Sequence, residues 1–213
     1  MDRHFGGPLD VTPASGERHN DMTLATSLRM SPAQPFLPAR TLTVPVEFFD
    51  QLRRAVLEGS SDASPLTVDA IRDAGYAAGQ ALFDHFATWL AEEGEAAPTE
   101  LADTRFPWLL QAFFHATGWG RVELRDLSEA VVALDASDWG EPVGASGGCL
   151  VSTGLFAGFF GRLADAPIAV LEVEAPDRSR GSCRFLLGSV DVMGYVWERM
   201  ARGIPYTQAA ATA

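Results

Sequence analysis

The chain has 213 residues, 47% of them hydrophobic, and a formal net charge of −12. This length suits one domain with some additional tail, and the acidic balance argues against a nucleic-acid partner because phosphate backbones would be repelled. All 16 basic residues are arginine, which excludes a lysine Schiff base and the lysine of a phosphate-binding loop.

Residues 1–42 are rich in proline, glycine, serine and threonine without a sustained period. This composition predicts a disordered N-terminal arm, followed by one domain over 43–203 and a flexible tail over 204–213. We see no apolar signal segment, and the most apolar run, Cys149 to Gly161, is shorter than the roughly 20 residues of a membrane span. We therefore expect a cytoplasmic protein, with loose membrane contact as an open alternative.

The first half of the domain reads as helical. Apolar residues at helical spacing predict a helix over 45–59 and a long helix from Pro65 to about Glu93. On one face of the long helix, Gly75, Ala78 and Gly79 would let another backbone come close. That face is expected to meet a partner helix or a second subunit, so a homodimer through this helix is predicted.

The second half mixes strands and helices. "TRFPWLLQAFFHATG" predicts a helix that ends at Gly118, and "GRVELRDLSE" with "AVVALDASDW" predicts a hairpin. A glycine-rich helix, "GGCLVSTGLFAGFFGRLAD", precedes the strands "PIAVLEVEA" and "GSCRFLLG" and a closing helix, "SVDVMGYVWERMARG". Because strands and helices do not alternate regularly, we predict an α+β fold with helices packed on a small antiparallel sheet.

Few residues in the sequence indicate redox or hydrolytic chemistry. "GWGRVE" and "GLFAGFFG" lack the spacing and context of a dinucleotide fingerprint, and no serine has a G-x-S-x-G context. His85 and His115 lie in apolar helices, where a histidine is more often packed than a ligand. If the domain has a ligand cavity, His115 is the better candidate for an axial ligand or a hydrogen-bonding partner. Asp135, Asp138 and Glu141 are expected to lie in a solvated loop with helix caps.

The two cysteines give a more specific pattern. Cys149 opens the glycine-rich helix, Glu172 lies on one strand and Cys183 on the next. Two thiolates and a carboxylate are proper zinc ligands, although a structural zinc normally takes four. The alternative is two buried cysteines that act as small hydrophobic residues.

The segment "GGCLVSTGLFAGFFGRLADAPIAVLEVEAPDRSRGSCRF" resembles the 4-vinyl reductase domain family, which shares the ligand-binding fold of TRAPP trafficking-complex subunits. The family pattern has a cysteine opening a glycine-rich helix, a strand ending in E-x-x-C, and a C-R-F strand. Cys149, Glu172 and Cys183 match it. The remaining cysteine falls on Ala175, so the implied metal site is one ligand short, and Asp177 or a water could supply that ligand.

The family includes sensor modules of aromatic-responsive regulators and stand-alone proteins, and this chain most resembles the stand-alone members of bacteriochlorophyll synthesis. The resemblance implies a role at the 4-vinyl reduction step, on divinyl protochlorophyllide or chlorophyllide. Because no nicotinamide, flavin or iron–sulfur motif is visible, we expect a carrier that presents a Mg-tetrapyrrole to other enzymes of that pathway. The expected ligand-binding residues are Phe114, His115, Trp119, Gly158 and Phe159.

Two alternatives to the carrier remain open, and catalytic residues are not assigned. One is a true vinyl reductase that uses an external electron donor. The other is a sensor of small aromatic or hydrocarbon molecules, or a protein-interaction scaffold, of the same domain family.

Overall fold

The computed structural model describes residues 48–49, 51–52, 65–141, 148–175 and 181–213. All described residues lie in one compact unit, within Gln34–Ala213. The predicted arm over 1–42 lies outside the described residues, as does most of the predicted helix over 45–59. Of that helix, residues 48–49 and 51–52 are described and are helical.

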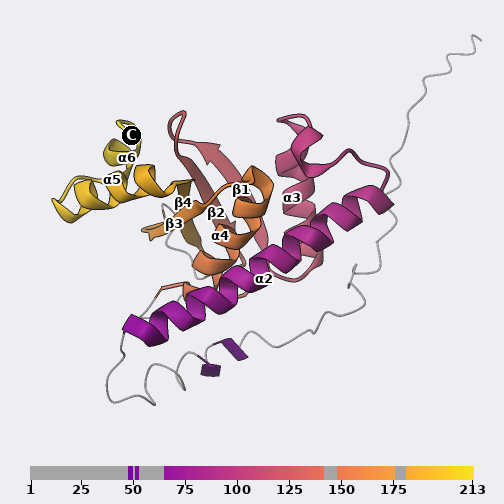
Figure 1. Ribbon diagram of the computed structural model, residues 1–213, viewed down its shortest axis with the longest axis horizontal. Coiled ribbons are helices and arrows are strands. Elements are labelled where there is room, and N and C mark those ends of the chain that lie inside the picture. Colours follow the sequence, from indigo (N-terminus) through magenta and orange to yellow (C-terminus); the bar gives the residue numbers. More distant parts are fainter. Residues whose placement is uncertain (1–47, 50, 53–64, 142–147, 176–180) are drawn as a thin grey trace, which may run out of the picture. The chain divides into compact units, whose positions relative to one another are not determined.

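A four-stranded sheet forms the centre of the described domain (Figure 1). Its strands are β1 (Arg121–Asp126), β2 (Val132–Ser137), β3 (Ile168–Val173) and β4 (Cys183–Ser189), in the order β1-β2-β4-β3, and all neighbours are antiparallel. Leu134 of β2 pairs with Leu124 on one side and Phe185 on the other, so apolar side chains share one face. The predicted α+β fold with a small antiparallel sheet is confirmed.

Two helices cross in close contact beside this apolar face. They are α2 (Pro65–Glu92) and α4 (Leu150–Ala164), and four glycines line their contact: Gly75 and Gly79 on α2, Gly154 and Gly158 on α4. A Cβ atom on any of the four would overlap a backbone carbonyl of the other helix. The small-residue face of the long helix therefore does meet a partner helix, which is α4 of the same chain. A homodimer through the long helix would have to use another of its faces.

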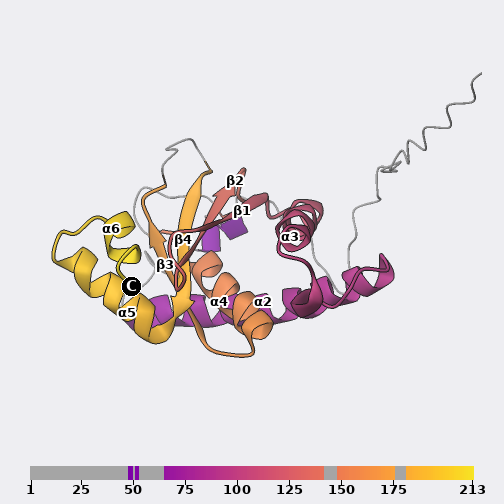
Figure 2. The same cartoon turned by 90° about the horizontal axis from the view of Figure 1, so that it is seen from above.

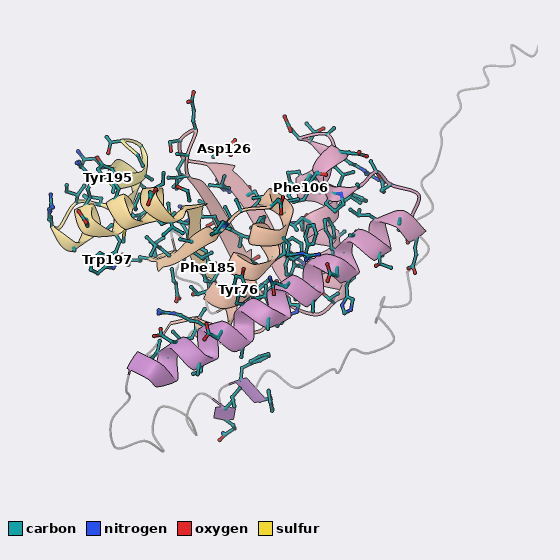
Figure 3. The ribbon with its side chains drawn as sticks, viewed as in Figure 1. Tyr76, Phe106, Asp126, Phe185, Tyr195 and Trp197 are labelled. Atoms are coloured by element: carbon teal, nitrogen blue, oxygen red, sulfur yellow. The ribbon has the colours of Figure 1, made fainter. Side chains whose placement is uncertain are left out.

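Aromatic side chains fill the space between the sheet, α4, α2 and α3 (Arg105–Ala116), as the crowded sticks in Figure 3 show. The fully buried members include Phe86, Phe113, Phe114, Phe156, Phe159 and Phe185. Many of their rings meet edge-to-face or tilted, with centroids between 5.0 and 6.3 Å apart, which is the arrangement that ring quadrupoles favour. This cluster is the main hydrophobic core.

A second cluster lies on the other face of the sheet. There α5 (Val190–Ala201) and α6 (Tyr206–Ala210) cover β3 and β4, at the end of the sheet away from α3 (Figure 2). The segment 204–213, predicted as a flexible tail, instead contains α6, whose Ala209 and Ala210 are fully buried. The small side chains let α6 approach Ala133 and Leu186 of the sheet.

Two further features complete the described part. A short 3-10 helix, η1 (Pro98–Glu100), lies between α2 and α3. Within the described ranges, none of the helices combines the length and the apolar character needed to cross a bilayer.

Candidate functional site

The predicted cluster of two cysteines and a glutamate does come together. Cys149 is the N-cap of α4, Glu172 lies in β3, and Cys183 opens β4. The two Sγ atoms are 2.8 Å apart, and the backbone N–H of Cys149 donates to Oε2 of Glu172 at 2.6 Å. The three potential ligand atoms all lie within 4.8 Å of one another. The cluster therefore forms because β3 pairs with β4 and the start of α4 lies beside them.

The residue before Cys149 explains how the carboxylate reaches the helix end. Gly148 has a φ of +68°, and a Cβ atom at this position would overlap the carboxylate of Glu172. Only glycine tolerates this backbone conformation at no steric cost and also leaves room for the carboxylate. A negative charge here is further favoured by the positive end of the α4 dipole.

Zinc is the metal that the donor set of this cluster fits. The hydrogen bond with Cys183 and burial raise the pKa of the Cys149 thiol, so the thiol is protonated unless a metal replaces the proton. Zn–S bonds of about 2.3 Å in tetrahedral geometry would place the two sulfurs about 3.8 Å apart, so they would have to separate by about 1 Å. Ala175 offers no ligand, and Asp177 lies outside the described residues.

A second carboxylate, that of Glu141, lies buried at the start of α4, which the sequence did not predict. Glu141 accepts hydrogen bonds from the backbone N–H groups of Val151 at 3.1 Å and Ser152 at 2.7 Å. The Ser152 hydroxyl donates to the same carboxylate at 2.5 Å and accepts from Nε1 of Trp139 at 2.7 Å. Glu141 is only 5% exposed, and burial raises its pKa. The prediction of a solvated loop with helix caps is wrong for Asp135, which lies in β2, and for Glu141, which is buried but does cap α4.

An apolar cavity of about 380 Å³, open to solvent on one side, lies between the N-terminal end of α3, the C-terminal end of α4 and the core face of the sheet. Its wall is formed mainly by Phe106, Leu124, Val132, Phe160, Leu163, Ile168 and Leu187. Polar groups are few, and among the described residues that line it Glu129 is the only ionisable one. The cavity therefore offers an apolar surface with one exposed acidic residue, Glu129, among those that line it.

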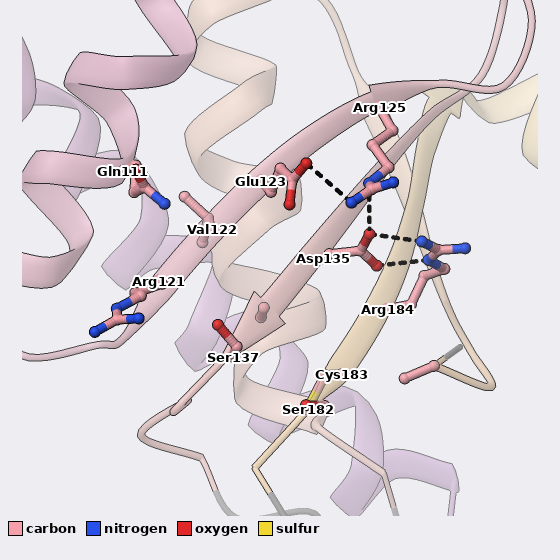
Figure 4. Close-up of a pocket in the computed structure, with 12 residues that line it drawn as sticks. Gln111, Arg121, Val122, Glu123, Arg125, Asp135, Ser137, Ser182, Cys183 and Arg184 are labelled. Atoms are coloured by element: carbon pink, nitrogen blue, oxygen red, sulfur yellow. Dashed lines mark hydrogen bonds and ion pairs between the residues drawn. The ribbon is translucent and has the colours of Figure 1, made fainter. Parts of the chain in front are cut away.

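A polar groove of about 450 Å³ lies on the opposite face of the sheet (Figure 4). Nε and Nη2 of Arg184 donate to the two carboxylate oxygens of Asp135 at 2.6 and 2.5 Å, and Nη1 donates to the hydroxyl of Tyr206 at 2.9 Å. Arg125 lies between Asp135 and Glu123, at 3.2 and 2.9 Å. The hydrogen bond to Asp135 raises the pKa of Arg184. Because Glu123, Arg125, Asp135 and Arg184 already pair with one another, we interpret the groove as an ion network that stabilises the sheet.

None of the five predicted ligand-binding residues lines the apolar cavity or the polar groove. Phe114 and Phe159 are fully buried in the aromatic core, and Gly158 lies against the carbonyl of Tyr76 in α2. His115 is exposed on α3, and the ring of Trp119 contacts those of Phe49 and Trp139. The aromatic residues that do line the apolar cavity are Phe106 and Phe160.

Comparison with known proteins gives similarities of fold. No protein-family model and no curated protein matches the chain. Among solved structures, the phenol-responsive sensory domain of the transcription activator PoxR, with phenol, is similar over 78% of this chain and 84% of that one, at 14% identity and a TM-score of 0.53. This likeness shows the fold.

Two more distant structures have TM-scores under 0.5. A vinyl-4-reductase family protein from Methanocaldococcus jannaschii covers 71% of this chain and 85% of its own, with 16% identity and a TM-score of 0.42. A TRAPP complex subunit 3 from Naegleria fowleri, covalently bound to palmitic acid, covers 67% and 91%, with 9% identity and a TM-score of 0.48.

Proposed function

We propose that the chain is a binding domain for a small apolar molecule, held in the cavity between α3, α4 and the sheet. The observation that carries the proposal is the cavity itself, at about 380 Å³ and with an almost wholly apolar wall. Ligand sites typically span about 300–1,000 Å³ and are lined by apolar and aromatic side chains. Since an apolar cavity of about 150 Å³ holds one benzene ring, there is room here for two fused rings.

The similarity in fold to a phenol-responsive sensory domain supports a small aromatic ligand. That protein is a sensor, and the sequence alternative of an aromatic or hydrocarbon sensor agrees with it. No residue role is carried over, because the identity is 14%.

The role of tetrapyrrole carrier in bacteriochlorophyll synthesis is the second candidate. Its support is the sequence resemblance at Cys149, Glu172 and Cys183. A macrocycle of four pyrrole rings is larger than two fused rings, so the cavity would have to widen to admit it. His115, one of the residues expected to bind the tetrapyrrole, is exposed on α3 and does not line the cavity. These two points favour the smaller ligand.

We further propose that Cys149, Glu172 and Cys183 hold a zinc ion. When bound, the metal would join the start of α4 to β3 and β4, and its fourth position would be open to water or to a residue outside the described ranges. The two thiol groups would lose their protons on binding, and Glu172 would remain hydrogen-bonded to the Cys149 N–H.

A calorimetric titration with 1-naphthylmethanol, a neutral bicyclic probe, tests the main proposal. Saturable one-to-one binding is expected for the unmodified chain. Ala164→Trp should abolish it, because Ala164 is the last residue of α4 and lines the cavity. Ala201→Trp is the matched control, at the exposed last residue of α5 and away from the cavity. Equal binding by both variants, or no binding by the unmodified chain, would contradict the proposal.

A further inference from the structure

We infer that the cavity selects an apolar molecule that carries a protonated amine, over a neutral one and above all over a carboxylate. This inference rests on the proposed function, since it concerns the same cavity. Its first support is the charge of the wall: among the described lining residues, Glu129 alone is ionisable, and no arginine lines the cavity. An ammonium group beside Glu129 would gain an ion pair, whereas a carboxylate would meet a like charge.

The end of α4 adds negative potential at the same place. Leu163 and Ala164, the last two residues of that helix, line the cavity, and the last carbonyl groups of a helix carry its negative partial charge. Asp165 follows directly as the C-cap. Arg162, the nearest basic residue along the helix, donates to Asp84 at 2.6 Å and does not line the cavity.

Two helix starts near the cavity, those of α3 and α5, would favour an anion. At α3, where Phe106 lines the cavity, the N–H groups of Arg105 and Phe106 donate to the carbonyl of Ala102 at 2.8 and 3.0 Å, and the Arg105 side chain pairs with Glu95. At α5, the positive end is also partnered. Ser189 lines the cavity, but its hydroxyl accepts the N–H of Val192 at 3.3 Å. Asp191 adds a full negative charge in the first turn of the same helix. Neither helix start therefore brings an unpaired basic side chain to the described lining residues.

The aromatic walls favour the same ligand class. Phe106 of α3, labelled in Figure 3, and Phe160 of α4 both line the cavity. The faces of such rings attract cations, and an apolar body attached to the ammonium group can fill the remaining chamber. A carboxylate would gain nothing from these rings and would lose its hydration without a partner.

The test compares three probes of one shape, namely 1-naphthylmethylamine, 1-naphthylmethanol and 1-naphthoate, by calorimetric titration at neutral pH. The amine should bind about fivefold tighter than the alcohol, the size of effect a partly exposed ion pair gives, and the acid should bind most weakly. Glu129→Gln should remove the preference for the amine while leaving the affinity for the alcohol unchanged. Glu198→Gln, on the exposed side of α5, is the matched control and should change none of the three affinities.

The outcomes separate this inference from the function on which it rests. If the alcohol binds and the amine binds no more tightly, the inference is overturned while the proposed function stands. If the amine preference survives in Glu129→Gln, the assignment of Glu129 is overturned. If none of the three probes binds, both the inference and the proposed function fail.

Discussion

Gly158 of α4 lies directly against the backbone carbonyl of Tyr76 in α2, so closely that a Cβ atom would overlap it. Gly154 makes the same approach to the carbonyl of Arg72, one turn earlier. In the sequence, these glycines could have marked either close packing or free space for a ligand. The contact with α2 shows that they serve close packing. The apolar cavity lies instead at the C-terminal end of α4, beside Leu163 and Ala164.

A substitution at this crossing should therefore cost stability. Gly158→Ala is expected to lower the free energy of unfolding by about 1–3 kcal/mol, because the added methyl group pushes two backbones apart. Gly194→Ala, in the middle of α5, is the matched control, since a Cβ atom there meets nothing within 4 Å. It should raise stability by up to about 1 kcal/mol through helix propensity. Urea unfolding measures both, and equal effects would contradict the packing role.

The buried carboxylate of Glu141 should make stability depend on pH. Burial raises its pKa above the usual 4.5 in the folded chain, so the folded state holds the proton more tightly than the unfolded state. Its contribution is therefore complete below that usual value and is lost as the pH rises through the raised pKa. The unfolding free energy of the unmodified chain should therefore fall, relative to that of Glu141→Gln, as the pH rises from about 4.5 into the neutral range. A difference that stays constant over this range would refute the assignment.

The ion pair between Arg184 and Asp135 should matter more than a surface pair. The side chain of Arg184 is 9% exposed, and Arg184→Met would leave Asp135 with Arg125 alone. We expect a loss of about 2–3 kcal/mol, below the full cost of breaking a buried pair because Asp135 is partly exposed. Arg72→Ala, which removes an exposed pair with Asp69 at 3.7 Å, should cost less than about 1 kcal/mol. Similar losses for the two variants in urea unfolding would show that burial does not strengthen the Arg184 pair.

Cobalt(II) can report on the proposed zinc site, because thiolate ligands give it a strong charge-transfer absorption. One equivalent should bind, with an affinity that rises with pH as the metal displaces the thiol protons. Cys183→Ser should remove much of the absorption, whereas Glu123→Gln, in the polar groove, should not. Ala175→Cys should tighten binding by supplying a fourth ligand. If the unmodified chain gives no such absorption while its thiols are reduced, the zinc proposal is wrong.

Most of the elements could be predicted from the sequence because their signals are local. The helix α3 ends at Ala116, just before Gly118, which adopts a φ of +83° that glycine accommodates. The cluster of Cys149, Glu172 and Cys183 could also be anticipated, since adjacent strands and the helix start bring these positions together.

The use of the aromatic residues could not be predicted in the same way. Periodicity identifies the apolar face of a helix, but it does not tell whether neighbouring side chains or a ligand cover that face. Phe114 and Phe159 are covered by other rings, whereas Phe160, next in the chain, lines the cavity. The burial of Glu141 could not be predicted for a related reason, because it depends on how α4, the next helix in the chain, packs against it.

The most direct test of the account is methyl NMR of the chain labelled at leucine, valine and isoleucine, with 1-naphthylmethanol added. The account predicts shifts for the methyl groups that line the cavity, those of Leu124, Val132, Leu163, Ile168 and Leu187. Leu110, fully buried in the aromatic core, should stay unchanged. Shifts confined to other methyl groups, or no shifts at concentrations that saturate the calorimetric signal, would contradict a ligand site between α3, α4 and the sheet.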